Sequence, residues 1–394
     1  MSPGREGALR SLNRTLVTRG AAFLAALSVL ASPLPAAART DGEGKLSILS
    51  WAGYVERGEN DKAFDWVTPF ERATGCKVTV RFAGSSEEMV AQMRDGTFDL
   101  VTASGDASLR LIAARSVQEI DIKRVPSWNS IDPRLRDAPW QMVGGRHYGV
   151  PFQWGPNFLL YNTKLFRDPP KSWSLLFEEQ DLPDGKPNTG RVQAYDSPMS
   201  IADAAVYLRA KRPDLGITDP YALDEKQYAA ALDALRAQRH IVQKYWNDGN
   251  VQVNDFAAEE AVAAVAWPFQ LHALVGLRQP VAWTLPDEGG TGWADTIMLG
   301  ANAHNPNCAY LWLEHSLRVK TQGDVAAWFG SVPVVLAACK SNALLTNDGC
   351  RANGLDLFDR LSFWRTPVAQ CGEKRTCVPY AKWMADFQAI RGRK

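Results

Sequence analysis

The stretch between residues 45 and 106 alternates short apolar runs with helical segments, and this order constrains the fold more than any other feature. Residues 45–50 and 76–82 have the alternating pattern of strands, and residues 98–102 form an apolar run of the buried-strand type. A helical segment separates each strand from the next. The β-α-β-α-β order predicts an α/β fold with an open, largely parallel sheet.

The segments that follow these three strands are candidates for a binding site. Open α/β sheets bind ligands beyond the carboxyl ends of their strands. Residues 51–54, 83–86 and 103–106 each follow a strand, so all three are expected on one rim. They carry Trp51, Tyr54 and Ser104 toward that rim.

A second α/β unit is expected between about residues 172 and 286. A short helix is predicted at residues 172–177, longer helices at 200–211 and 224–246, and strands at 190–195, 262–267 and 281–286. The length of 394 residues also favours two domains over one core.

Two Gly-rich or Pro-rich breaks separate these units. Residues 148–162 pass through Trp154-Gly-Pro-Asn157 between two apolar runs, which predicts either a hairpin or an extended crossing between domains. Residues 289–292 precede another apolar strand and are expected to return the chain. The predicted N-terminal lobe is 39–151 plus 294–334, and the predicted C-terminal lobe is 152–293 plus 335–394.

Residues 1–38 have the order of a secretory signal peptide. Four Arg residues precede a short apolar run, and small residues end the segment. The alternative is an amphipathic first helix of the fold. The signal-peptide interpretation places the mature protein in the periplasm.

Charge and motifs point away from several function classes. Without residues 1–38 the chain has 40 basic and 42 acidic side chains, so it has no nucleic-acid footprint. We find no nucleophile elbow, phosphate loop or metal-spaced histidines. We therefore expect no enzyme activity, no cofactor, no metal and a monomer, with an exported enzyme on the same scaffold as the alternative.

Six cysteines lie outside the leader, which favours disulfides in an exported protein. Proximity suggests the pairs Cys339–Cys350 and Cys371–Cys377. Cys76 and Cys308 are either a third pair or small buried residues.

Aromatic residues recur at the predicted strand ends and crossings, twice with a carboxylate close by. The set is Trp51, Tyr54, Trp154, Asp196, Trp267, Trp293 and Asp295. Ring faces attract a cation and carboxylates add charge-assisted hydrogen bonds, so such a set suits a protonated amine. The alternatives are core packing for each Trp, and an N-cap or turn role for the two Asp residues.

Several short motifs, in order along the chain, resemble the solute-binding proteins of bacterial polyamine importers, a branch of the type II periplasmic binding proteins. The matching segments are 50–54 (SWAGY), 70–75 (FERATG), 98–102 (FDLVT), 149–155 (GVPFQWG), 160–163 (LYNT), 172–177 (SWSLLF), 266–267 (AW) and 293–295 (WAD).

The resemblance implies two hinged lobes, each an open, mainly parallel sheet flanked by helices. In that family a small amine ligand, putrescine-like or spermidine-like, binds in the cleft and passes to membrane permease subunits of an ABC importer. The residues matching Trp51, Tyr54, Asp196, Trp267, Trp293 and Asp295 line the cleft in that family. Ser104, at a strand end, and Trp154, beside the hinge, complete the expected ligand set.

The chain also departs from the family pattern. Met199 stands where polyamine binders carry a second acid, and Gly105-Asp106 stand where they carry a Tyr. An ω-amino acid such as γ-aminobutyrate is therefore an alternative ligand, supported if Arg191 or Arg81 reaches the cleft. A sensor subunit that docks a chemoreceptor is a further alternative.

Overall fold

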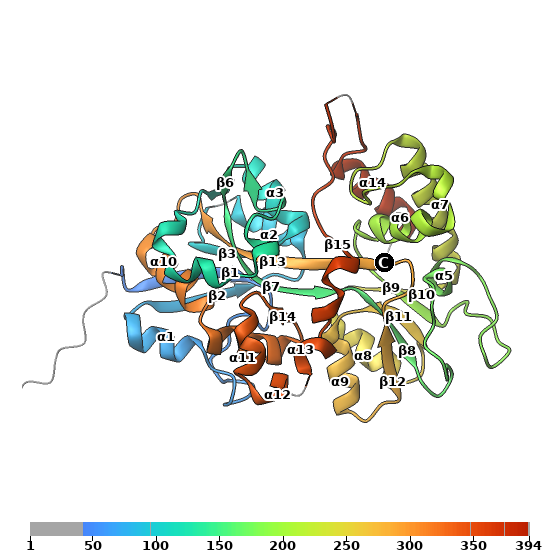
Figure 1. Cartoon of the computed structure of the whole chain (residues 1–394), viewed down its shortest axis with the longest axis horizontal. Helices are drawn as coiled ribbons and strands as arrows, with labels where there is room; N and C mark the ends of the chain where they lie inside the picture. Colours follow the sequence, from blue (N-terminus) through green and yellow to red (C-terminus); the bar gives the residue numbers. More distant parts are fainter. Residues whose placement is uncertain (1–41, 95, 347, 374, 393–394) are drawn as a thin grey trace, which may run out of the picture. The chain divides into compact units, whose positions relative to one another are not determined.

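The computed structural model describes residues 42–94, 96–346, 348–373 and 375–392, so the predicted signal peptide lies outside the described residues. Two large mixed sheets organise these residues (Figure 1). The first sheet has the path β14-β7-β13-β3-β1-β2, with β4 and β15 also paired to β13. Its strands are β1 (Lys45–Ser50), β2 (Lys77–Phe82), β3 (Leu100–Ser104), β4 (Val117–Gln118), β7 (Gly149–Pro156), β13 (Gly290–Gly300), β14 (Val332–Pro333) and β15 (Leu361–Phe363).

The second sheet has the order β10-β9-β11-β8-β12. Its strands are β8 (Phe158–Asn162), β9 (Val192–Tyr195), β10 (Val242–Trp246), β11 (Ala263–Ala266) and β12 (Val281–Thr284). A small hairpin pairs β5 (Met142–Val143) with β6 (Arg146–His147). The described α-helices are α1 (Val67–Thr74), α2 (Ser86–Met93), α3 (Gly105–Ala113), α4 (Pro133–Arg136), α5 (Ser174–Phe177), α6 (Ser200–Lys211), α7 (Glu225–Ile241), α8 (Gly249–Ala257), α9 (Pro268–Gly276), α10 (Pro306–Ser316), α11 (Val319–Phe329), α12 (Ala343–Thr346), α13 (Gly349–Ala352) and α14 (Tyr380–Arg391).

The parallel unit predicted near the N-terminus is confirmed. Strand β1 pairs in parallel with both β2 and β3. Helix α1 ends at Gly75, whose φ of 74° is the left-handed conformation that glycine adopts readily. The carboxyl ends of β1 and β3 therefore lie side by side and place Trp51 and Ser104 near each other.

The crossing prediction for residues 148–162 is also confirmed, and the hairpin alternative is wrong. Strand β7 belongs to the first sheet and β8 to the second, and only Asn157 separates them. Strand β13 lies beside β7 in Figure 1 and pairs with it in antiparallel register. Strand β13 is antiparallel to β3, and β8 is antiparallel to β11 and β12, so both sheets are mixed.

The helix predicted for 224–246 is shorter than expected. Helix α7 ends at Ile241, and the next five residues form β10, which pairs in parallel with β9. The β-branched Val242 and the alternating VQKYW pattern suit an edge strand, and this tertiary pairing overrides the helical period.

The C-terminal tail, which the sequence assigns to the second lobe, contacts both cores. Val334, Val335 and the segment around Cys350 pack with the first core and α11. Trp383 and Phe387 of α14 pack with the second core. The exact lobe boundaries stay a prediction.

Three disulfides close the described cysteines. The predicted pairs Cys339–Cys350 and Cys371–Cys377 are confirmed. A third bond joins Cys76 to Cys308 across 232 positions of the chain. Within the described residues, the structure contains no helix of the length and apolarity needed to cross a membrane.

Candidate functional site

A buried carboxylate stands at the centre of the candidate site. Asp295 of β13 lies directly opposite Ser104 of β3 in the sheet, and its side chain is 4% exposed. The Ser104 hydroxyl donates to Oδ1 of Asp295, and the Tyr54 hydroxyl donates to Oδ2 at 2.7 Å. The strand pairing therefore brings together three of the predicted ligand residues.

Among the described residues, Asp295 has no basic partner, so no positive charge offsets its burial. Burial raises the pKa of Asp295 to about 7, and the nearby Asp106 carboxylate adds to the rise. The two hydroxyl donors oppose this shift by stabilising the anion. An ionised Asp295 is therefore a buried negative charge without a counterion, and a cation bound beside it would compensate that charge.

Aromatic rings supply the second part of the site. Trp267 is half-buried, and its ring centroid lies 5.1 Å from that of Tyr195 and 4.9 Å from that of Trp246. Tyr195 also stacks on Trp364 at 5.8 Å with nearly parallel planes. These four side chains are called the ring cluster, and three of them, Tyr195, Trp267 and Trp364, belong to the second core together with Trp293.

Trp293 and Trp154 are more buried than a purely ligand-facing role requires. Trp293 is 4% exposed, and its indole N–H has no partner among the described residues. Trp154 is fully buried and packs edge-on against Phe358 and Phe363 in the first core. The geometry favours a core role for Trp154, whereas Trp293 belongs to the same core as most of the ring cluster and contacts Phe329.

Gly155 makes room for the Trp293 ring, because a Cβ on Gly155 would lie 2.5 Å from Cζ2 of Trp293. We expect Gly155→Ala to displace the ring and to weaken ligand binding by about tenfold, since overpacking shifts side chains at a typical cost of 1–3 kcal/mol. Ligand-dependent Trp fluorescence checks this. The control is Gly276→Ala, where an added Cβ has nothing within 4 Å. Unchanged affinity in Gly155→Ala would show that the position of the Trp293 ring does not affect ligand binding.

Asp196 differs from its expected state. It lies at the end of β9, and the guanidinium of Arg391 pairs with it, with Nε 3.2 Å from Oδ1 and Nη1 3.3 Å from Oδ2. An internal cation therefore already neutralises this carboxylate. The C-terminal position of Arg391 gave no sequence signal for the pair.

The two arginines that would support an amino acid ligand do not join the cluster. Arg191 forms a bidentate pair with Asp184, at 3.1 and 2.8 Å. Arg81 is exposed on β2.

Two further carboxylates escaped sequence reasoning. Asp106 is buried beside the Ser86 hydroxyl, and burial raises its pKa to about 6 despite the charge of Arg110. Asp203 of α6 accepts a hydrogen bond from Thr291, and burial raises its pKa to about 7. An acidic residue in the first turns of a helix is ordinarily explained by the helix dipole, so the pattern did not single them out.

Tyr195 and Trp364 were also missed, for different reasons. Tyr195 ends a strand and obeys the same rim rule as Asp196, so the sequence did contain a signal for it. Trp364 follows β15 in the tail, where no periodic pattern marks it. Its backbone N–H donates to Gly292 at 2.7 Å, which ties the tail to the crossing strand.

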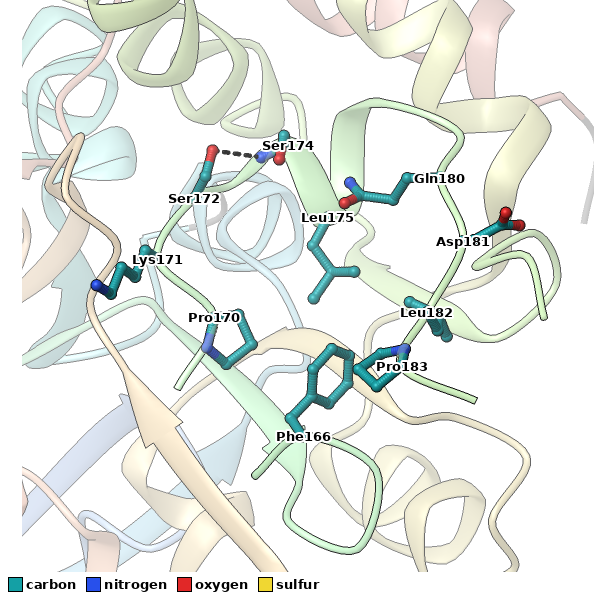
Figure 2. A pocket seen from close by; sticks show the side chains of 10 residues that line it. All are labelled: Phe166, Pro170, Lys171, Ser172, Ser174, Leu175, Gln180, Asp181, Leu182 and Pro183. Atoms are coloured by element: carbon teal, nitrogen blue, oxygen red, sulfur yellow. Dashed lines mark hydrogen bonds between the residues drawn. The ribbon is translucent and has the colours of Figure 1, made fainter. Parts of the chain in front are cut away.

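A separate groove of about 460 Å³ lies near α5 (Figure 2). Figure 2 shows Phe166, Leu175 and Pro183 on its walls, and Ser172 hydrogen-bonded to the backbone of Ser174. Its lining residues include none of the predicted ligand set. We therefore place the candidate site at Asp295 and the rings, not in this groove.

Comparison with known proteins gives a consistent family. Residues 65–349 match the model of the bacterial extracellular solute-binding proteins. The spermidine/putrescine-binding periplasmic protein of Salmonella typhimurium is 26% identical over 324 residues, covering 80% of this chain and 85% of that protein. The putrescine-binding periplasmic protein PotF of Escherichia coli is 25% identical over 289 residues, covering 69% of this chain and 73% of that protein.

A solved structure agrees on the fold. The spermidine/putrescine ABC transporter substrate-binding protein PotD from Streptococcus pneumoniae superposes with a TM-score of 0.68 at 15% identity, over 88% of this chain and 99% of that one. The fold is therefore the two-domain α/β fold of periplasmic binding proteins. With the family model covering more than half of its residues, the chain belongs to the bacterial extracellular solute-binding protein family.

Proposed function

We propose that the protein is the periplasmic binding component of an ABC importer and that its ligand is a small amine-bearing solute of the putrescine or spermidine type. It acts by binding and delivering the solute to permease subunits, without catalysis. Its curated relatives are named for binding putrescine or spermidine in the periplasm, which supports both the ligand class and the location.

The observation that carries this proposal is the environment of Asp295. A buried carboxylate that receives only hydroxyl donors among the described residues is costly in the absence of a cation. A ligand ammonium would supply that cation and a charge-assisted hydrogen bond to the carboxylate. Rings beside the amine, such as Trp267 and Tyr195, add cation–π attraction of about 0.5–2 kcal/mol each.

The crossing strands suggest how ligand binding is coupled to motion. In the proposal, the lobes 39–151 plus 294–334 and 152–293 plus the remaining tail close about the β7–β8 junction and β13. Ser104 and Asp295 lie in the first sheet, whereas Tyr195 lies at the end of β9 in the second. A ligand held by residues of both sheets would favour the closed state by its differential affinity.

An ω-amino acid remains the competing ligand. Its carboxylate would need a basic partner, and Arg191 and Arg391 are already paired with Asp184 and Asp196. The charge balance around Asp295 therefore favours an amine without a carboxylate. A sensor role at a chemoreceptor would use the same ligand site with a different docking partner.

Binding of the amine should be coupled to proton release below neutral pH. Asp295 has a pKa raised to about 7, so it is largely protonated at pH 6, and an ammonium partner favours its ionised form. The ionised fraction of such a carboxyl falls from about one half at pH 7 to about one tenth at pH 6, so we expect putrescine affinity to fall by about fivefold over this interval for each carboxyl that must ionise. Calorimetry at pH 6 in two buffers of different ionisation enthalpy counts the released protons.

The same linkage applies to the unliganded protein with a definite sign. The native pKa of Asp295 lies above the ordinary value, so the native state binds more protons than the unfolded state between about pH 4 and 7. The stability of the unliganded protein should therefore fall as pH rises through this window.

Binding of putrescine without proton release at pH 6 would contradict the prediction that Asp295 is an ionisable residue of the ligand site.

A further inference from the structure

Asp203 is connected to the ring cluster by a chain of three hydrogen bonds. The indole N–H of Trp267 donates to Oδ1 of Asn157 at 2.8 Å. The amide of Asn157 donates to the Thr291 hydroxyl at 2.6 Å, and that hydroxyl donates to Oδ1 of Asp203 at 2.5 Å. The chain therefore runs from the indole of Trp267 to the carboxylate of Asp203.

This chain passes through both crossings between the sheets. Asn157 is the residue between β7 and β8, and Thr291 lies near the start of β13. Their backbones are also joined, because the N–H of Asn157 donates to the carbonyl of Thr291 at 3.0 Å. Asp203 is thus held at a fixed place beside the two crossing segments.

All three donors point toward the carboxylate. The positive end of each dipole faces Asp203, so the chain favours a negative charge at that position. Within the described part of the protein, Thr291 gives the one hydrogen bond to this carboxylate, and no basic side chain pairs with it. Oδ2 therefore keeps its capacity to accept a hydrogen bond.

Asp203 also retains access to space. Its residue is partly exposed, as are Trp267 and Tyr195 of the ring cluster. A carboxylate of a partly exposed residue that is oriented by a neutral donor and lacks a cation is suited to a ligand ammonium.

We propose that Asp203 is a second ligand carboxylate of the site and binds the second ammonium of a diamine, while Asp295 binds the first. This inference rests on the proposed function and specifies its substrate class. Asp203 takes the place of the second acid whose absence at Met199 left the ligand class open. With Asp196 neutralised by Arg391, the two ligand-facing charges come from Asp203 and Asp295.

The test compares a diamine with a monoamine of equal carbon length. Affinities for putrescine and butylamine are measured by calorimetry on the wild-type protein and on Asp203→Asn, which keeps an oxygen acceptor for Thr291. We expect Asp203→Asn to weaken putrescine by at least about 20-fold and butylamine by less than about threefold, because only the diamine has a second ammonium that loses its charged partner.

Thr291→Val gives a second line of evidence if Asp203→Asn does not fold. It removes the hydroxyl that orients the carboxylate, and putrescine should again lose more affinity than butylamine. Equal losses for both ligands would show a structural role and overturn the inference, as would unchanged affinities in both variants. A wild-type protein that binds neither amine would overturn the proposed function itself, which separates the two failures.

Discussion

Replacing Asp295 with Asn is expected to reduce the affinity for putrescine by at least about 100-fold, or about 2.7 kcal/mol. The change removes the charge that the ligand ammonium would meet, while the amide keeps the size of the side chain. Burial raises the pKa of Asp295 to about 7, so the ionised carboxylate is a cost to the unliganded protein at pH 8. The unfolding midpoint of the unliganded variant at pH 8 should therefore equal or exceed that of the wild type.

The opposite directions of these two effects make the test specific. A residue with a purely structural role would lose stability when altered, whereas a ligand residue kept at a cost to stability loses affinity alone. The matched control is Asp233→Asn, an exposed carboxylate paired with Arg236 on α7, which should change neither quantity. Wild-type affinity in Asp295→Asn would remove this carboxylate from the ligand site.

Removing the Cys76–Cys308 disulfide is expected to cause the largest loss of stability among the three bonds. It closes a loop of 232 residues, and the chain-entropy description assigns such a loop about 5 kcal/mol. The Cys371–Cys377 bond spans six positions, for which the same description gives about 2 kcal/mol. The two double alanine variants, compared by denaturant unfolding, measure this difference.

The two cysteines also link separate parts of the first core. Cys76 precedes β2 and Cys308 lies in α10, and both are completely buried. Their bond therefore ties the first parallel unit to the segment that follows the return crossing. A smaller loss for the Cys76/Cys308 variant than for the Cys371/Cys377 variant would show that the unfolded chain is already compact around the long loop.

The part of the first sheet formed by β1, β2 and β3 could be predicted from local patterns. These strands follow one another in the chain, and a helix joins each to the next. The period-2 runs of β1 and β2 mark these strands in the sequence, and the rule that strand ends share one rim predicts that Trp51, Tyr54 and Ser104 lie close together. Asp295 is predicted from the recurrence of aromatic and acidic residues at strand ends and from the resemblance, and its pairing opposite Ser104 gives the physical reason for its place.

The remaining features depend on contacts between distant segments, which local patterns do not encode. The ending of α7 at Ile241 depends on β10 pairing with β9. Arg391 and Asp196 are 195 positions apart in the chain, and they meet only because α14 packs on the second core. In the sequence, Asp203 has the pattern of an ordinary helix residue, and only the fold brings it beside Thr291 of β13.

Calorimetric titration of the mature protein measures whether the uncompensated carboxylate of Asp295 binds an amine. Putrescine, spermidine and γ-aminobutyrate are titrated separately at pH 8, where Asp295 is ionised. We expect saturable binding of putrescine, spermidine or both with one ligand per chain, and weaker binding of γ-aminobutyrate. Tighter binding of γ-aminobutyrate, or no binding of any of the three, would contradict it.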